Sequence, residues 1–202
     1  MKLYYAPGAC SLAPHIVARE AVLQLTLVKV DTDTHRTAQG EDFHAINSKG
    51  AVPVLELDNG ERLTEGPIIV QYLADFARHR DLMPEADSLA RYRVMEWQNY
   101  VTSELHKSFT PLFSSALDAS AKATLKTLLR KKFEWLDTQL AGKDYLTGGR
   151  FTGADAYLFV VTSWAKHVAL DIADLANVQR YSRRVAMRPA VQEAMRVEGL
   201  IA

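Results

Sequence analysis

The pattern of hydrophobic and polar positions divides the chain into two parts. Up to about residue 77, short strand-like apolar runs mix with helix-like runs, whereas from about Ser88 onward the apolar positions follow helical periodicity. Between these parts, residues 78–87 contain Met83-Pro84 and several charges but little apolar periodicity, which is typical of a connecting segment. We therefore expect two domains, residues 1–80 and residues 81–202.

The first part predicts an α/β domain with a thioredoxin-like fold. Its pattern predicts strands at residues 2–5, 25–30, 51–57 and 61–63, and helices that begin near Ser11, near Glu41 and at Gly66-Pro67. Asp58-Asn59-Gly60 favours a tight hairpin turn, because Asn-Gly tolerates the positive φ angles that such a turn needs. The strand-helix-strand order before the hairpin favours parallel pairing. The resulting order, β-α-β-α-β-β-α, is that of a thioredoxin-like fold.

The second part predicts an all-α helical C-terminal domain. Helices are expected at residues 88–113, 119–140, 154–168 and 175–187, with a short one after Pro189. Thr152-Gly-Ala-Asp155 matches a capping box, in which the Thr side chain and the Asp three residues later satisfy free backbone donors at the start of a helix.

Composition narrows the class of function. With 202 residues, 48% of them hydrophobic, the chain has enough apolar material for a core without disulfides or a structural metal. The 24 Lys and Arg residues balance the 24 Asp and Glu residues, so no net field attracts nucleic acid or a membrane surface. A small-molecule ligand is therefore expected.

Motifs for export and metal binding are not found. The N-terminus lacks the pattern of a signal peptide, and Cys10 is the single cysteine, so we expect a reducing cytoplasm and no internal disulfide. The 6 histidines lack short ligand spacing, which argues against a metal site. Sequence motifs of hydrolases, NTPases and dinucleotide-binding proteins are also missing.

Cys10 and Ser11 stand where the first strand turns into the first helix. Free N–H groups and the positive end of the helix dipole favour an anion there, such as a thiolate. Lowering a thiol pKa by two units needs roughly 2.7 kcal/mol, more than a dipole alone supplies, so the Ser11 hydroxyl and an imidazolium or N–H of His106 are candidate donors. The alternative is that Cys10 is a small buried apolar residue and Ser11 an ordinary N-cap.

Two further turns point to a peptide-like ligand. Pro53 opens a strand although it cannot donate to a sheet, which a cis bond after Val52 would explain by leaving the Val52 backbone free to pair with an extended peptide. A trans proline at a strand start is the alternative. Glu65, just before the helix at Gly66, combines an acceptor for an ammonium with N–H groups for a carboxylate, the charge pattern of an α-amino acid head group such as a γ-glutamyl end. Glu65 as a simple partner of the helix dipole is equally compatible.

One face of the long predicted helix carries polar residues at helical spacing, Asn99, Ser103 and His106. Such a face is either part of a site or a solvated seam. Nearby aromatic residues could wall an apolar pocket or belong to the ordinary core; they are Phe109, Phe113, Tyr157 and Trp164.

Taken together, these segments resemble the bacterial beta-class glutathione transferases over essentially the whole chain. The resemblance is carried by residues 1–11, Asn47-Ser-Lys-Gly-Ala-Val-Pro53, Leu63-Thr-Glu-Gly66, Gln71-Tyr-Leu-Ala-Asp75, Ser103-Glu-Leu-His-Lys107 and Phe151-Thr-Gly-Ala-Asp-Ala-Tyr-Leu158.

The resemblance implies that glutathione is a co-substrate, that no cofactor is permanently bound, and that the protein is a homodimer. It implies a glutathione site made of Cys10, His35, Val52, Glu65, Gly66, Asn99, Ser103, Glu104 and His106, some of the last four reaching across the dimer interface. Cys10 is then expected beside the glutathione sulfur, where it can form a mixed disulfide, with Ser11 and His106 assisting. Pro53 is expected to be cis, and Thr152 with Asp155 to be a structural cap.

Three positions depart from the family pattern. His35 stands where a lysine is common, so its charge toward the glycine carboxylate would fade above about pH 6.5. Gly66 replaces a serine seen in many related classes and leaves only a backbone N–H for the glutamyl carboxylate. Gly153, inside the capping box, is poorer for helix formation than alanine by up to about 1 kcal/mol.

Three functions are compatible with these residues. The leading one is a transferase that activates the glutathione thiol for attack on a small hydrophobic electrophile held by the four aromatic residues. A second is glutathione-dependent thiol-disulfide exchange or reductive dehalogenation through Cys10. The third is a transferase-like binding or regulatory protein without turnover, against which the polarity of Cys10, Ser11, Glu65 and His106 argues.

Overall fold

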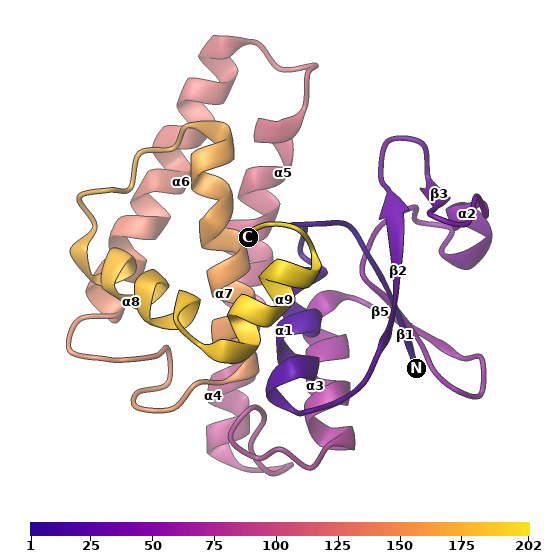
Figure 1. The fold of residues 1–202 in the computed structure, drawn as a ribbon. Coiled ribbons are helices and arrows are strands. Elements are labelled where there is room, and N and C mark those ends of the chain that lie inside the picture. Colours follow the sequence, from indigo (N-terminus) through magenta and orange to yellow (C-terminus); the bar gives the residue numbers. More distant parts are fainter.

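The computed structural model describes residues 1–202 and contains one five-stranded sheet. The sheet lies beside a larger group of helices (Figure 1). The strands are β1 (Lys2–Tyr5), β2 (Thr26–Asp31), β3 (Arg36–Thr37), β4 (Val54–Glu56) and β5 (Arg62–Thr64). Their order in the sheet is β3-β2-β1-β4-β5, so the first strand lies in the middle. The short strand β3 was not predicted; it is only two residues long and lies at the sheet edge.

Strand pairing confirms the prediction in part. Strand β1 pairs in parallel with β2, with Leu3 opposite Leu27, but β4 runs antiparallel to β1, with Leu3 opposite Leu55. The expectation of parallel pairing is therefore wrong for this strand. Helix α2 (Phe43–Ile46) has four residues and rises only about 6 Å, too little to return the chain along the sheet, so β4 enters from the opposite end.

Helices α1 (Leu12–Glu20) and α3 (Gly66–Phe76) lie between the sheet and the C-terminal helices (Figure 1). Helix α1 buries seven of its residues, from Leu12 to Ala18, because it contacts α3 on one side and α7 and α9 on others. A single cluster of 41 buried residues runs through both predicted domains. A smaller cluster around Phe43 lies between the sheet and α2.

The long helix predicted at residues 88–113 consists of three segments. They are α4 (Leu89–Tyr100), the π-helical segment η1 (Val101–His106) and α5 (Lys107–Phe113). Several hydroxyls bond to the carbonyl four residues earlier, including Thr102 to Gln98 and Ser108 to Glu104, a pattern that loosens the α-helical ladder. Pro111 also lacks the N–H that would complete the ladder within α5. The π segment brings Thr102 and His106 to the cavity described below.

The remaining helices are α6 (Ala119–Gln139), α7 (Gly153–Ser163), the 3₁₀ segment η2 (Trp164–Val168), α8 (Ala176–Ala186) and α9 (Pro189–Val197). The capping box is confirmed at the start of α7: the Asp155 carboxylate accepts from the N–H and the hydroxyl of Thr152, each at 2.8 Å. The glycine at position 153, which is poor for helix formation, has a steric explanation: a Cβ there would overlap Val70 of α3. None of the helices is long and apolar enough to cross a membrane.

Polar contacts attach the last helices to the beginning of the chain. Arg188 forms a two-pronged ion pair with Glu20 of α1, at 2.6 and 2.8 Å. The buried Glu198 carboxylate accepts from the N–H of Gly8 at 3.0 Å, and Trp164 donates its indole N–H to the carbonyl of Gly8 at 2.9 Å. The loop that precedes Cys10 is thus held by side chains from the C-terminal helices.

Candidate active site

A cavity of about 360 Å³ lies between the sheet domain and the segments η1 and α7. It is lined by residues from both predicted domains: Cys10, Asn47, Lys49, Ala51, Val52, Pro53, Thr64, Glu65, Gly66, Pro67, Thr102, His106, Lys107 and Tyr157. Five of the predicted site residues are therefore brought together here along with Tyr157: Cys10, Val52, Glu65, Gly66 and His106.

Cys10 lies just before α1, but its surroundings favour the neutral thiol. The backbone N–H groups of Cys10 and Ser11 favour the thiolate, yet burial outweighs them and raises the pKa of Cys10 to about 11. The Sγ lies 3.3 Å from the Val52 carbonyl, to which it donates. In the protein without ligand, desolvation of a Cys10 thiolate thus outweighs what the two N–H groups contribute, so the helix start that favours an anion does not by itself ionise Cys10.

Ser11 is fully buried and does not face the cavity. Its hydroxyl accepts from the N–H of Ala6 at 3.1 Å and donates to the Ala6 carbonyl at 3.2 Å. The prediction that this hydroxyl donates to a sulfur in the site is therefore not met. Ser11 instead closes the loop between β1 and α1, since both of its hydrogen bonds span that loop.

The Val52-Pro53 peptide bond is cis, as expected. Val52 lies outside the strands, and its N–H makes no backbone hydrogen bond, whereas its carbonyl accepts from Cys10. The N–H is thus available to an extended ligand.

Glu65 precedes α3 in a sparsely populated backbone conformation, with φ of +67°. Such a conformation costs about 1–3 kcal/mol in a residue with a side chain and is typical of functional sites. The N–H of Gly66 lies in the first turn of α3, where no helical carbonyl can reach it. Lys49 contacts the Glu65 carboxylate at 2.7 Å and the Thr64 hydroxyl at 2.9 Å. The turn therefore presents an anion and a free N–H, and Lys49, from 16 residues earlier in the chain, adds a cation beside them.

His106 and Tyr157 form a hydrogen bond inside the cavity, with 2.6 Å between Nδ1 and the phenol oxygen. Burial, aided by the charge of Lys107, lowers the pKa of His106 to about 4, so the imidazole is neutral at pH 7. These surroundings disfavour the imidazolium that the sequence left as one candidate, and they favour the neutral ring as an N–H donor. Burial also raises the pKa of Tyr157 far above its ordinary range, so this phenol keeps its proton.

Four predicted glutathione ligands do not line this cavity. The His35 ring packs on His44, with 4.4 Å between ring centroids, and its buried Nδ1 has no hydrogen-bond partner. Asn99 lies at an adjoining hollow between α3 and α4, Ser103 donates to the Asn99 carbonyl, and Glu104 pairs with Lys132 of α6 at 2.9 Å. In the single chain these four predicted ligands therefore lie outside the cavity lining.

Three of the four aromatic residues pack on one another, and Tyr157 joins them only through the His106 ring. Trp164 packs edge-on against Phe109 and Phe113, with centroid distances of 5.7 and 6.1 Å. Phe109 is fully buried and Trp164 nearly so, whereas Phe113 is 54% exposed. Of the four, Tyr157 alone lines the cavity, so the prediction that all four wall one pocket is not met.

Sequence reasoning missed several residues of the lining, among them Lys49, Thr102 and Lys107. Lys49 and Lys107 stand within segments that carry the family resemblance, and a cation beside a site for two carboxylates could have been inferred from them. Thr102 stands four residues before His106, a spacing that puts two side chains on one helix face, so periodicity could have found it.

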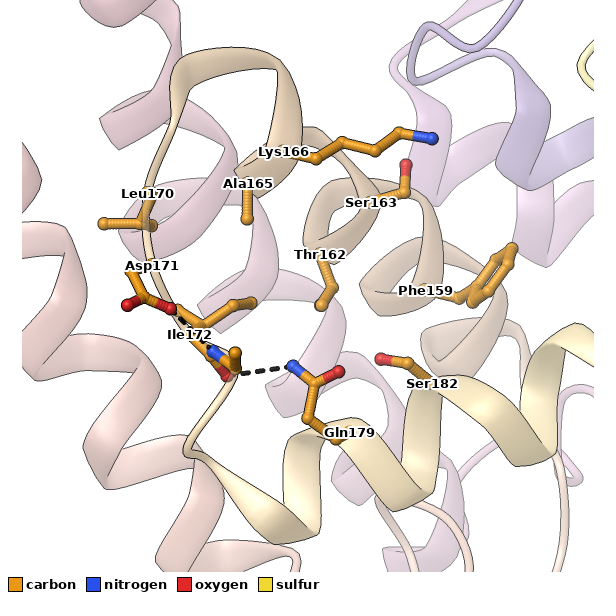
Figure 2. Close-up of a pocket in the computed structure, with 11 residues that line it drawn as sticks. Phe159, Thr162, Ser163, Ala165, Lys166, Leu170, Asp171, Ile172, Gln179 and Ser182 are labelled. Carbon is orange, nitrogen blue, oxygen red and sulfur yellow. Dashed lines mark hydrogen bonds between the residues drawn. The ribbon is translucent and has the colours of Figure 1, made fainter.

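A second cavity, of about 330 Å³, lies between α7, η2 and α8 (Figure 2). Its walls combine apolar residues such as Phe159 and Leu170 with polar ones such as Thr162, and Gln179 donates to the Ile172 carbonyl across its edge. It contains no thiol or imidazole, and no cluster of metal-ligating side chains occurs in the chain. Of these two cavities, the first is therefore the one that contains a thiol and an imidazole.

Comparison with known proteins agrees with this architecture. Residues 1–75 match the glutathione S-transferase N-terminal domain, and residues 116–184 match the glutathione S-transferase C-terminal domain. The chain is 46% identical to glutathione S-transferase GstA of Escherichia coli O157:H7 over 200 residues, covering 99% of this chain and 100% of the relative. It is 37% identical to glutathione S-transferase GST-4.5 of Xanthomonas campestris pv. campestris, covering 99% of this chain and 100% of the relative. The chain belongs to the glutathione S-transferase family.

Solved structures define the group within that family. A sphingomonad glutathione S-transferase complexed with glutathione is 43% identical with a TM-score of 0.95, and each chain covers 100% of the other. The bacterial beta-class glutathione S-transferase of Sphingomonas chungbukensis is 42% identical with a TM-score of 0.96, again with 100% of each chain covered. The predicted resemblance to the bacterial beta class is thereby confirmed.

Proposed function

We propose that this protein is a glutathione transferase that binds glutathione in the cavity between its domains and activates the thiol for attack on hydrophobic electrophiles. One observation carries the proposal: the cavity combines Glu65 and the Gly66 N–H with the unpaired Val52 N–H, Cys10 and His106. These groups match, in order, the charged glutamyl end, the peptide and the sulfur of glutathione. The sphingomonad relative was solved with glutathione bound.

In this proposal the two charges of the glutamyl group are recognised separately. Its ammonium contacts Glu65, and its carboxylate contacts the Gly66 N–H at the positive end of α3. We expect Lys49, whose ammonium lies 2.7 Å from Glu65, to contact that carboxylate too and so to compensate for the serine hydroxyl that Gly66 lacks.

The glutathione sulfur is expected near Cys10 and His106, where the start of α1 and a neutral imidazole N–H stabilise negative charge. The thiol of Cys10, protonated at pH 7, is one more donor there. Catalysis is then mainly positioning of the sulfur and stabilisation of its thiolate.

The proposal includes a homodimer in a reducing cytoplasm. Large apolar side chains lie exposed on α3 and at the start of α4, among them Ile68, Phe76, Leu89 and Tyr92. An interface over α3 and α4 would cover them and would bring a partner's surface to the hollow that contains Asn99.

Calorimetric titration with glutathione, followed by conjugation of an aryl halide such as chlorodinitrobenzene, tests the proposal. We expect glutathione binding and a glutathione adduct of the aryl ring. A protein that fails to bind glutathione would be a binding or regulatory protein for another ligand, and the proposal would be wrong. Gel filtration at micromolar concentration tests the dimer.

Thiol-disulfide exchange or reductive dehalogenation is a second candidate, because Cys10 lines the cavity. The raised pKa of Cys10 argues against it, since only the thiolate attacks a disulfide. The variant Cys10→Ala is expected to keep aryl-halide conjugation within about fivefold, because it removes one neutral donor. Loss of disulfide reduction with intact conjugation would assign redox chemistry to Cys10 as an additional activity.

A further inference from the structure

Tyr157 and His106 are placed so that one determines the protonation pattern of the other. His106 comes from η1 and Tyr157 from α7, and the two rings meet nearly edge-on, at 78° and with 5.9 Å between centroids. The phenol oxygen lies 2.6 Å from Nδ1 of His106, and both residues line the cavity. Tyr157 is almost completely buried, so water does not replace this contact.

The imidazole is also fixed from a second side. Trp164 packs against the His106 ring at 72°, with 4.8 Å between centroids. The indole itself is held by its hydrogen bond to the Gly8 carbonyl. Because of these contacts a flip of the ring would cost both the aromatic packing and the hydrogen bond to Tyr157.

The protons can be assigned from the partners. A neutral imidazole carries one proton, on Nδ1 or on Nε2, and a hydrogen bond to one nitrogen decides which. The Thr102 hydroxyl lies beside the phenol and donates its own proton to the Gln98 carbonyl at 2.8 Å. Of the two acceptors near the phenol proton, the Thr102 oxygen and the imidazole Nδ1, the imidazole nitrogen is the stronger base. The phenol proton therefore goes to Nδ1, and the imidazole proton goes to Nε2.

We propose that Tyr157 is a positioning residue, which holds His106 as the Nε2–H tautomer so that a neutral N–H donor faces the glutathione sulfur. The identity of that sulfur rests on the proposed function. Tyr157 was predicted to wall the electrophile pocket, and this contact gives it a different role. His106 is then a hydrogen-bond donor and not a general base.

The proton balance of thiol activation follows. The S–H bond of glutathione breaks, the electron pair stays on sulfur, and the proton leaves to bulk water. His106 cannot accept it, because its single lone pair, on Nδ1, is occupied by the Tyr157 hydroxyl. The Nε2–H then donates to the thiolate, an interaction stronger than its bond to the thiol because the acceptor is charged.

Nitrogen NMR of protein labelled with ¹⁵N-histidine tests the assignment, with the His106 signals identified by their loss in His106→Gln. We expect a pyrrole-type Nε2 and a pyridine-type Nδ1, both unchanged between about pH 6 and 8, with and without glutathione. A protonated Nδ1 in the wild-type protein would overturn the proposal. This measurement needs no variant of Tyr157 and is valid even if glutathione does not bind.

The variant Tyr157→Phe removes the hydroxyl and keeps the ring. We expect a mixture of His106 tautomers and about a fivefold loss of kcat/KM, recovered at higher pH as more bound thiol ionises. Tyr145→Phe, which removes a hydroxyl that bonds to Arg188 outside the cavity, is the matched control. It should change neither the His106 tautomer nor kcat/KM. Unchanged tautomers in Tyr157→Phe would also contradict the proposal, whereas failure of the wild-type protein to bind glutathione would contradict the proposed function alone.

Discussion

Replacing Glu65 by glutamine removes one negative charge from the proposed ammonium site and keeps the shape of the side chain. Hydrogen bonds to charged groups contribute roughly 1.5–3 kcal/mol. The Glu65 side chain is 66% exposed, so solvent screening places its contribution at the lower end, about 1.5 kcal/mol. The expected result is a rise of about tenfold in the Kd for glutathione.

Calorimetry with two ligands separates this charge effect from a change of structure. Glutathione should lose about tenfold in affinity for Glu65→Gln, whereas the analogue glutaryl-cysteinyl-glycine, which lacks the ammonium, should bind the variant and the wild type alike. Glu61→Gln makes the same change of charge on the exposed hairpin, outside the cavity, and is the control. If Glu65→Gln weakens both ligands equally, Glu65 does not bind the ammonium and the reasoning is refuted.

Two further results are expected. Gly153→Ala should destabilise the protein by about 1–2 kcal/mol in urea unfolding, because overlap of the new methyl with the rigid Val70 exceeds the gain in helix propensity. Val70→Ala should lower the free energy of unfolding by less in the Gly153→Ala background than in the wild-type protein, because it relieves that overlap. A stabilised Gly153→Ala would contradict the close packing of α7 on α3. The lowered pKa of His106 means that the unfolded chain binds its proton first, so the contribution of this residue to stability falls as pH drops from 6.5 to about 4. His106→Gln should therefore lose less stability than the wild-type protein between pH 6.5 and about 4. An equal loss of stability in both proteins would mean that another group titrates in this range.

Local sequence chemistry was sufficient to predict much of the fold. The Asn59-Gly60 turn, the proline after Val52 and the Thr152-Asp155 box each act over a few residues, and each is found where it was expected. Strand direction was not predictable in the same way, because antiparallel entry of β4 depends on the length of α2 and not on the pattern of β4 itself.

The site was predictable in its residues but not in its electrostatics. The sequence placed Cys10 and Ser11 at a helix start, yet whether burial or the helix end controls the pKa of Cys10 depends on packing from the distant helices. Likewise the orientation of Ser11 toward Ala6 depends on the conformation of a loop held by Glu198 and Trp164, residues more than 150 positions away. Periodicity carries no information about such contacts.

The central claim is that bound glutathione is ionised at neutral pH by the start of α1 and the N–H of His106. Ultraviolet difference spectroscopy of the glutathione complex, titrated from about pH 5 to 9, measures this directly through the absorbance of the thiolate. The account predicts a thiolate band already present at pH 7, with its midpoint at least one unit below that of a free thiol near 8.5. A midpoint equal to that of free glutathione would contradict it.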